Sequence, residues 1–105
     1  MRKITNEFIL NFRTYLTEEE KSENTTEKYI RDVTFFMMWL GGREVTKMSV
    51  LEYKKELCRK YLPSSVNAAI SSLNSFFGFM QWHSIRIKAV KIQRRIFSSK
   101  DKELT

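Results

Sequence analysis

Residues that form turns are scarce in this chain, which has three glycines and one proline among its 105 residues. An all-β fold of this size needs many tight turns, and most of those turns use glycine or proline. Hydrophobic residues make up 42% of the chain and include eight Phe, four Tyr and two Trp, which is enough to fill one core. The sequence therefore predicts a single all-α domain, a bundle of helices.

Apolar residues recur at helical spacing in four stretches, which predict helices over residues 6–19, 26–40, 47–61 and 66–82. The most regular stripe belongs to the second stretch: Tyr29, Val33, Phe36, Met37 and Leu40. Phe35, Met38 and Trp39 fall partly outside that stripe, so the second helix is apolar over more than half of its circumference. We therefore expect it to be the central helix of a four-helix bundle.

Short polar residues that accept a hydrogen bond from the backbone stand at the start of each predicted helix. The expected N-caps are Thr5, Asn24 or Thr25, Thr46, and Ser64 or Ser65. Glu27 follows Asn24 by three residues, as in a capping box. Gly41 and Gly42 are expected to end the second helix, because glycine adopts the left-handed conformation without steric cost. Pro63 is expected to stop the third helix.

The third and fourth predicted helices each have an inward face. These faces comprise Val50, Tyr53, Leu57 and Tyr61 in the third helix, and Val66, Ala69, Ile70, Leu73, Phe76, Phe77 and Met80 in the fourth. The opposite face of the fourth helix is polar and uncharged, with Asn67, Ser71, Asn74 and Ser75. After His83 the helical pattern loosens and apolar residues alternate with basic ones. Both a strand and an extended linker are consistent with that stretch.

The net charge of +7 is unevenly distributed along the chain. Five basic residues and no acidic ones lie in one stretch of ten: Arg86, Lys88, Lys91, Arg94 and Arg95. A stretch of this kind suits an arm that contacts phosphates, because each neutralised phosphate releases counterions. A basic tail that is merely solvated fits the same residues equally well.

Residues for catalysis, metal binding or cofactor binding are nearly absent. One histidine and one cysteine exclude an internal disulfide and leave almost no material for a metal site, and no glycine-rich phosphate loop is present. We interpret Cys58 as a small core residue, His83 as an exposed or capping histidine, and the four tyrosines as packing residues. We therefore expect no enzyme activity, no cofactor, no metal and no small-molecule substrate.

The longest apolar run, residues 35–40, is far shorter than the roughly 20 residues of a membrane helix. The start of the chain has no apolar signal segment. We therefore expect a soluble protein with no membrane partner, and the single cysteine favours a reducing, intracellular compartment.

Two surfaces have side chains that suit DNA. The outer face of the fourth helix offers hydrogen-bonding groups on short side chains, and asparagine pairs bidentately with adenine. The second helix begins with Asn24, Thr25 and Lys28, followed by Arg31, and backbone amides at a helix start beside a lysine form a phosphate site. An ordinary polar helix face and a simple capping role account for the same residues.

These residues fall in a longer pattern. Ser22-Glu23-Asn24-Thr25, then Tyr29, Asp32-Val33, Phe36 and Leu40 resemble the S-x-N-T…Y-x-x-D-L-x-x-F…L pattern of the core-binding domain of tyrosine recombinases, the family of phage and conjugative-transposon integrases. Val45-Thr46, Val50, Tyr53 and Leu57 are similar to the family's next motif, with Ser49 in place of its usual acid. Ser64-Ser65-Val66-Asn67, Ile70-Ser71-Ser72-Leu73 and Phe76-Phe77 resemble its fourth-helix motif.

The resemblance spans residues 6–105, and the stretch from Lys91 to Thr105 is similar to the linker that opens the catalytic domain. The chain departs from the family pattern in two ways. The turn after the fourth helix lacks the usual Asn-Pro, and Asn67 and Asn74 stand where basic residues often occur.

The resemblance implies a SAM-like four-helix bundle that forms half of a C-shaped clamp around DNA. Residues 1–88 would form the DNA-binding domain, and residues 89–105 a basic linker toward a catalytic domain that this chain lacks. The attacking tyrosine and the Arg-His-Arg group of the family lie in that catalytic domain. The second and fourth helices would face the major groove, and the linker would cross the DNA backbone.

The expected partner is double-stranded DNA, bound in a sequence-specific way by a monomer whose full-length parent assembles as a tetramer on DNA. The resemblance also implies a bacterial or phage-encoded mobile element and a cytoplasmic, nucleoid-associated protein. The residues expected to contact DNA are Asn24, Thr25, Lys28, Arg31, Ser64, Ser65, Asn67, Ser71, Asn74, Lys88, Lys91, Arg94 and Arg95.

Two alternatives remain. The bundle is also consistent with a protein-interaction module, in which exposed Phe35, Met38 or Trp39 docks a partner helix. Binding of single-stranded RNA is the weaker alternative, because it uses exposed aromatic residues that this chain needs for its core.

Overall fold

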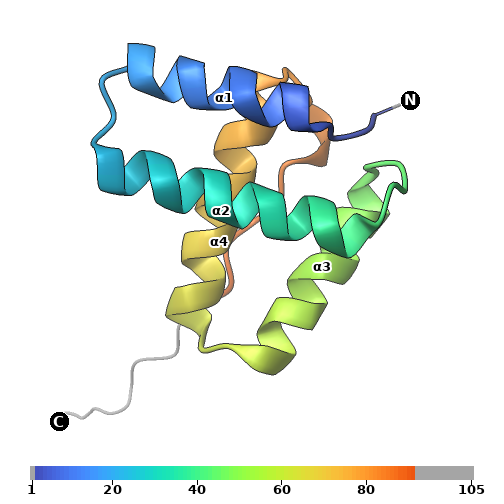
Figure 1. Ribbon diagram of the computed structural model, residues 1–105. Coiled ribbons are helices and arrows are strands. Elements are labelled where there is room, and N and C mark those ends of the chain that lie inside the picture. The colour runs from blue at the N-terminus through green and yellow to red at the C-terminus, as the bar shows by residue number, and fades with distance from the viewer. Residues whose placement is uncertain (1, 92–105) are drawn as a thin grey trace, which may run out of the picture.

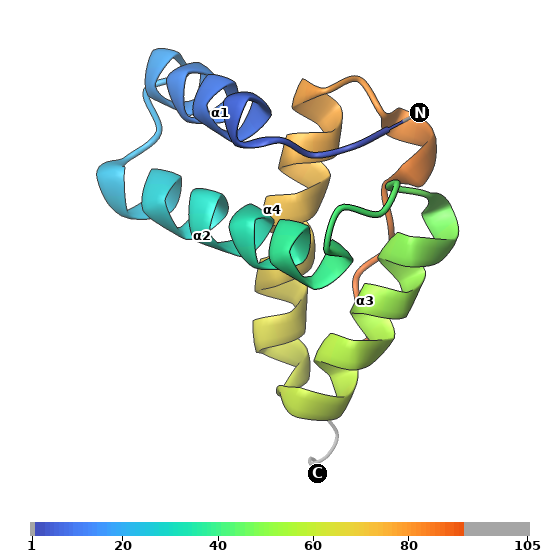
Figure 2. The same cartoon turned by 45° about the vertical axis from the view of Figure 1, so that its right-hand side comes forward.

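The computed structural model describes residues 2–91. Within this range the chain forms α1 (Asn6–Glu18), α2 (Glu23–Leu40), α3 (Lys47–Lys60), α4 (Pro63–Phe79) and a short 3-10 helix, η1 (His83–Ile85), and it forms no strand. The helices α1 and α2 run antiparallel as one pair, and α3 and α4 run antiparallel as a second pair that crosses the first (Figures 1 and 2). The predicted all-α, four-helix fold is confirmed.

The core lies where the two helix pairs cross. Phe12 of α1, Phe36 of α2, and Phe76 and Phe77 of α4 are completely buried. The rings of Phe12 and Phe76 meet edge to face at 5.2 Å, and those of Phe36 and Phe77 at 6.1 Å. Burial of one such side chain stabilises a fold by roughly 1.5–3 kcal/mol, so these four rings supply much of the force that holds α1 and α2 against α4.

Two of the predicted helix starts are confirmed. Thr5 caps α1 by accepting a hydrogen bond from Phe8 N, and Thr46 caps α3 by accepting one from Ser49 N. The hydroxyl of Ser49 accepts a hydrogen bond in return from Thr46 N, at 2.8 Å. Ser49 therefore completes a capping box at a position where the family pattern has an acid, and the short serine side chain serves the same backbone donor.

The other two predicted helix starts are wrong. The N-cap of α2 is Ser22, whose hydroxyl accepts a hydrogen bond from Thr25 N, so Asn24 and Thr25 lie inside the first turn. The helix α4 begins at Pro63 with Leu62 as N-cap and without a side-chain cap, so the next two serines are also within its first turn. Proline favours the first helical position because its fixed φ suits a helix and its missing amide has no partner to lose there.

Two residues that we interpreted as core residues of the third helix are exposed. Cys58 and Tyr61 both face solvent, with Tyr61 exposed by 56%. The reason for Tyr61 is that α3 ends at Lys60, and Tyr61 adopts an extended backbone, which takes its side chain off the helical stripe. The expected inward residues Val50, Tyr53 and Leu57 are buried.

After α4 the chain reverses direction and returns along the bundle. The helix η1 makes the turn, and Ile85 and Ile87 are buried beyond it. Residues 86–91 have no regular secondary structure, which decides between the strand and the extended segment in favour of the latter. Of the helices formed by residues 2–91, none combines the length and the apolar character that crossing a membrane requires.

Candidate nucleic-acid interface

The outer face of α4 is built from small side chains. Ser64, Ala68, Ser71, Ser75 and Gly78 follow one another at steps of three and four, so they lie on one side of the helix. Ser64 and Ser71 are exposed, and the other three are half-buried. No side chain on this line extends beyond an oxygen on its Cβ, so a ligand can approach the helix backbone closely while hydroxyl groups remain available to it.

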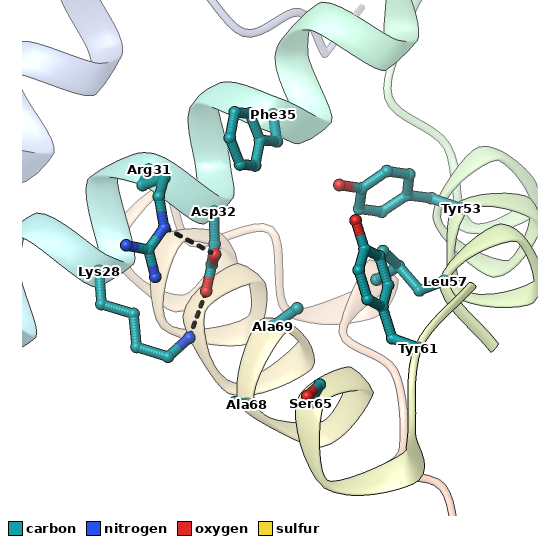
Figure 3. Close-up of a pocket in the computed structure, with 10 residues that line it drawn as sticks. All are labelled: Lys28, Arg31, Asp32, Phe35, Tyr53, Leu57, Tyr61, Ser65, Ala68 and Ala69. Carbon is teal, nitrogen blue, oxygen red and sulfur yellow. Dashed lines mark hydrogen bonds and ion pairs between the residues drawn. The ribbon is translucent and has the colours of Figure 1, made fainter.

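One side of this face is bordered by α2, which contributes two cations. Lys28 and Arg31 lie around the same pocket as Ser65 and Ala68 of α4, and the pocket has a volume of about 330 Å³ (Figure 3). The sequence prediction thus named three residues, Lys28, Arg31 and Ser65, that the fold brings together across two helices.

Asp32 holds these two cations in place. Its side chain is only 12% exposed, and its carboxylate forms ion pairs with Lys28 at 2.5 Å and with Arg31 at 3.9 Å (Figure 3). The buried Ser72 of α4 donates a hydrogen bond to the same carboxylate at 2.7 Å. A partly buried carboxylate needs such partners, and here the partners also fix the cationic edge of α2 against α4.

Aromatic residues form the far side of the same pocket. Phe35 and Tyr61 are exposed at its edge, and Tyr53 is buried beneath them. Figure 3 shows Tyr53 and Tyr61 with their hydroxyl groups turned toward one another. Burial raises the pKa of Tyr53 to about 12, and the negative charge of Asp32 adds to the rise, so this hydroxyl is neutral at physiological pH.

Two polar side chains near the start of α2, those of Asn24 and Thr25, differ in exposure and hydrogen bonding. Asn24 is exposed, whereas Thr25 is half-buried and its hydroxyl accepts a hydrogen bond from the Ser22 hydroxyl at 3.0 Å. Glu27 does not form the expected capping box with Asn24, because its carboxylate pairs with Arg13 of α1. The hydrogen bond from Arg13 lowers the pKa of Glu27.

Asn67 and Asn74 lie on the other side of the outer face of α4, where they bind the returning chain. The side-chain amide of Asn74 makes two hydrogen bonds to the backbone of Ile87, and that of Asn67 makes two to the backbone of Val90. Each amide thus uses one of its two N–H donors and one of its two oxygen lone pairs to bind the chain's own backbone, a role that the sequence did not indicate. Whether these residues also touch DNA stays a prediction.

The returning chain on this second side carries three cations. Lys88 and Lys91 are exposed, and the guanidinium of Arg86 lies over Gly78, 4.0 Å from where a Cβ would stand. Arg86 is not among the residues predicted to contact DNA, although it is the first residue of the basic stretch 86–95. Arg94 and Arg95, which were predicted to contact DNA, lie outside the described residues.

Lys47 and Lys54 of α3 are the other residues that sequence reasoning missed. Each donates a hydrogen bond to a backbone carbonyl of the returning chain, Lys47 to Arg86 and Lys54 to Lys88. Their spacing of seven residues places them on one face of α3. This spacing does not predict that the two lysines bind the returning chain, because lysines that only face solvent also recur every seven residues on one side of a helix.

The described residues form a small four-helix domain in which the small-residue face of α4 lies between α2, with Lys28 and Arg31, and the returning chain, with Lys88 and Lys91. The chain belongs to the family of N-terminal SAM-like domains of phage integrases, whose pattern matches residues 8–85. It resembles a tyrosine recombinase of Pseudothermotoga lettingae, with 33% identity over 102 residues that cover 82% of this chain and 36% of that protein.

A second relative is the TnP I resolvase of Bacillus thuringiensis, with 34% identity over 77 residues that cover 66% of this chain and 27% of that protein. The chain therefore spans about a third of the length of these two relatives. No solved structure matches the chain. The predicted family and its SAM-like helical fold are confirmed by the family match.

Proposed function

We propose that this chain binds duplex DNA in a sequence-specific way, as the N-terminal clamp half of a site-specific tyrosine recombinase that carries out DNA integration or recombination. One observation carries the proposal: the small-residue face of α4 lies between the edge of α2 that carries Lys28 and Arg31 and the returning chain that carries Lys88 and Lys91. Cleavage of DNA would belong to a catalytic domain outside the described residues.

The arrangement suits a DNA groove, which has phosphates along both edges and base edges on its floor. Cations at both sides of a helix can contact the two phosphate backbones, while the short side chains between them reach the bases. Ser64, Ser65 and Ser71 would supply hydroxyl groups to bases or phosphates, and Asn24 would supply an amide at the start of α2. Arg94 and Arg95 would extend the cationic edge further along the DNA.

Fluorescence anisotropy on a labelled duplex at two salt concentrations tests DNA binding. We expect binding at low salt that weakens steeply as salt rises, since each phosphate contact contributes about 0.9 to the slope of log K against log salt. The double variant Lys28→Ala/Arg31→Ala should lower that slope by about 2. The matched control Lys3→Ala/Lys55→Ala removes the same charge from exposed positions elsewhere and should leave the slope nearly unchanged.

Absence of binding at low salt, or equal losses in the two double variants, would contradict the proposal. Selection of bound duplexes from a random library then tests sequence specificity. A Ser71→Ala variant that selects the same sequences as the parent would exclude base contact by Ser71.

A protein-interaction module is the second candidate, and one observation favours it. Phe35 and Met38 of α2 are exposed by 54% and 66%, and they are neighbours at a spacing of three. In that case the domain would dimerise or bind a helical peptide without responding to DNA. Size-exclusion chromatography with light scattering separates the two candidates, because the DNA-binding proposal expects this domain to be monomeric and leaves tetramer assembly to the full recombinase.

A further inference from the structure

Residues 86–91, which we call the strap, run antiparallel to α4 and are bound to it by side chains alone. The Asn74 amide donates to Ile87 O at 2.7 Å and accepts from Ile87 N at 3.0 Å. The Asn67 amide donates to Val90 O at 2.9 Å and accepts from Val90 N at 2.6 Å. Each asparagine thus pairs with both backbone groups of one strap residue, as a neighbouring strand does in a β-ladder.

The spacing of the two asparagines matches the strap. Seven residues of helix advance about 10.5 Å. The three residues from Ile87 to Val90 advance about 10 Å when the chain is extended. An extended strap therefore meets the second asparagine in register with the first, without bending.

The helix α3 holds the strap from its other side. Lys47 Nζ donates to Arg86 O at 2.5 Å, and Lys54 Nζ donates to Lys88 O at 2.7 Å. Two strap carbonyls that do not bind an asparagine, those of Arg86 and Lys88, thus receive a hydrogen bond from a lysine. Side chains of α3 and α4 therefore bind the strap backbone at four of its six residues, Arg86, Ile87, Lys88 and Val90. The bound backbone in turn fixes where the strap's own side chains begin.

The bound strap has apolar side chains that face the bundle and lysine side chains that face solvent. Ile87 is buried and Val90 is half-buried, whereas Lys88 and Lys91 are exposed. The same bonds lead the chain from the end of α4 back toward its beginning, so that Val90 lies beside Asn67 in the first half of α4.

We propose that Asn67 and Asn74 are positioning residues, which hold the strap so that Lys88 and Lys91 are placed for DNA phosphates opposite the Lys28 and Arg31 edge. This inference rests on the proposed DNA binding. Its physical reason is preorganisation: an unclamped strap would have to lose its backbone freedom at the moment of binding, and that loss would be subtracted from the affinity.

A double-mutant cycle tests the inference in the whole chain. The variants are Asn67→Ala/Asn74→Ala, Lys88→Ala/Lys91→Ala, and the combination of all four changes. We expect the asparagine variant to lose about 10-fold in affinity for duplex DNA at low salt, and the lysine variant to lose affinity and about 2 units of salt slope. In the combined variant the asparagine changes should cost nothing further, because the lysines they position are absent.

Two further measurements keep the test informative if the double asparagine variant is poorly folded. Asn67→Ala alone leaves the Asn74 bonds in place and should give a smaller loss of affinity. Thr5→Ala removes the N-cap of α1 and controls for a general loss of stability, so it should bind DNA as the parent does. Hydrogen exchange of the Ile87 and Val90 amides should accelerate in the asparagine variants and not in Thr5→Ala.

Additive effects of the asparagine and lysine pairs, or an asparagine variant with unchanged affinity, would overturn the positioning role while leaving DNA binding intact. If the parent chain shows no salt-dependent binding to duplex DNA, the proposed function fails and the positioning role fails with it. Binding by the parent chain therefore distinguishes the two failures: it is absent if the proposed function fails and present if only the positioning role fails.

Discussion

The hydroxyl of Ser72 donates a 2.7 Å hydrogen bond to Oδ2 of Asp32, which joins α4 to α2 beneath the pair of cations on α2. Ser72 is completely buried, and the same carboxylate oxygen also accepts a hydrogen bond from Lys28. A single buried polar contact therefore links the packing of the two helices to the placement of the cationic edge.

Ser72→Ala is expected to lower the free energy of unfolding by about 1–2 kcal/mol, because a partly buried carboxylate would lose a hydrogen bond that it cannot replace within the interface. Urea unfolding followed by circular dichroism measures this change. Ser71→Ala, at the exposed neighbouring position, is the matched control and should stay within about 0.5 kcal/mol of the parent. Equal effects of the two changes would show that the hydrogen bond to Asp32 contributes nothing.

Ser22→Ala and Asn24→Ala should separate capping from DNA contact at the start of α2. Loss of the Ser22 cap is expected to cost about 1 kcal/mol of stability. Asn24→Ala should change stability by less than about 0.5 kcal/mol, since its side chain is exposed and the cap lies elsewhere. Thermal and urea unfolding measure both, and a larger cost for Asn24→Ala would restore Asn24 as the cap.

Tyr53 should make the fold sensitive to alkali. Its pKa is raised to about 12 by burial, whereas tyrosine in an unfolded chain titrates near 10. Its contribution to stability is therefore complete below about pH 10 and is lost as the pH rises from about 10 to 12. In the parent, the free energy of unfolding should fall between about pH 10 and pH 12, and Tyr53→Phe should reduce that fall by on the order of 1 kcal/mol. Urea unfolding at each pH measures the difference. Parallel profiles for the parent and the variant would contradict this assignment.

Much of the fold was predictable from the sequence, because apolar periodicity is a local signal. The stripe of α2 and the capping of α1 and α3 depend on residues close together in the chain, and all were predicted correctly. The start of α2 was placed too late because several adjacent residues, such as Ser22, Asn24 and Thr25, are all good N-caps. Backbone geometry alone chooses among them. The start of α4 was placed too late because Pro63, interpreted as the stop of the third helix, is instead the first residue of α4, which has no side-chain cap.

The candidate site was less predictable, because its contacts join distant segments. Asn67 and Val90 are 23 residues apart, and Lys47 and Arg86 are 39 apart, so no local pattern reveals that they meet. Of the predicted outer face of α4, Ser71 and Ser75 lie on the small-residue face, whereas Asn67 and Asn74 bind the returning chain beside it. Polarity cannot distinguish an amide that awaits a ligand from one that binds the chain's own backbone.

Cys58 offers a direct test of the orientation of α3, since the sequence interpretation placed it in the core and the structure places it at the surface. An exposed thiol reacts with a disulfide reagent without prior unfolding, whereas a core thiol must wait for the protein to open. We therefore expect 5,5′-dithiobis(2-nitrobenzoic acid) to modify Cys58 in the native protein within about tenfold of the rate in urea, where exposure alone sets the rate. Protection of Cys58 that scales with the unfolding equilibrium would mean that α3 is rotated about its axis. Tyr53 and Leu57 would then also leave the positions that define the pocket beside α2.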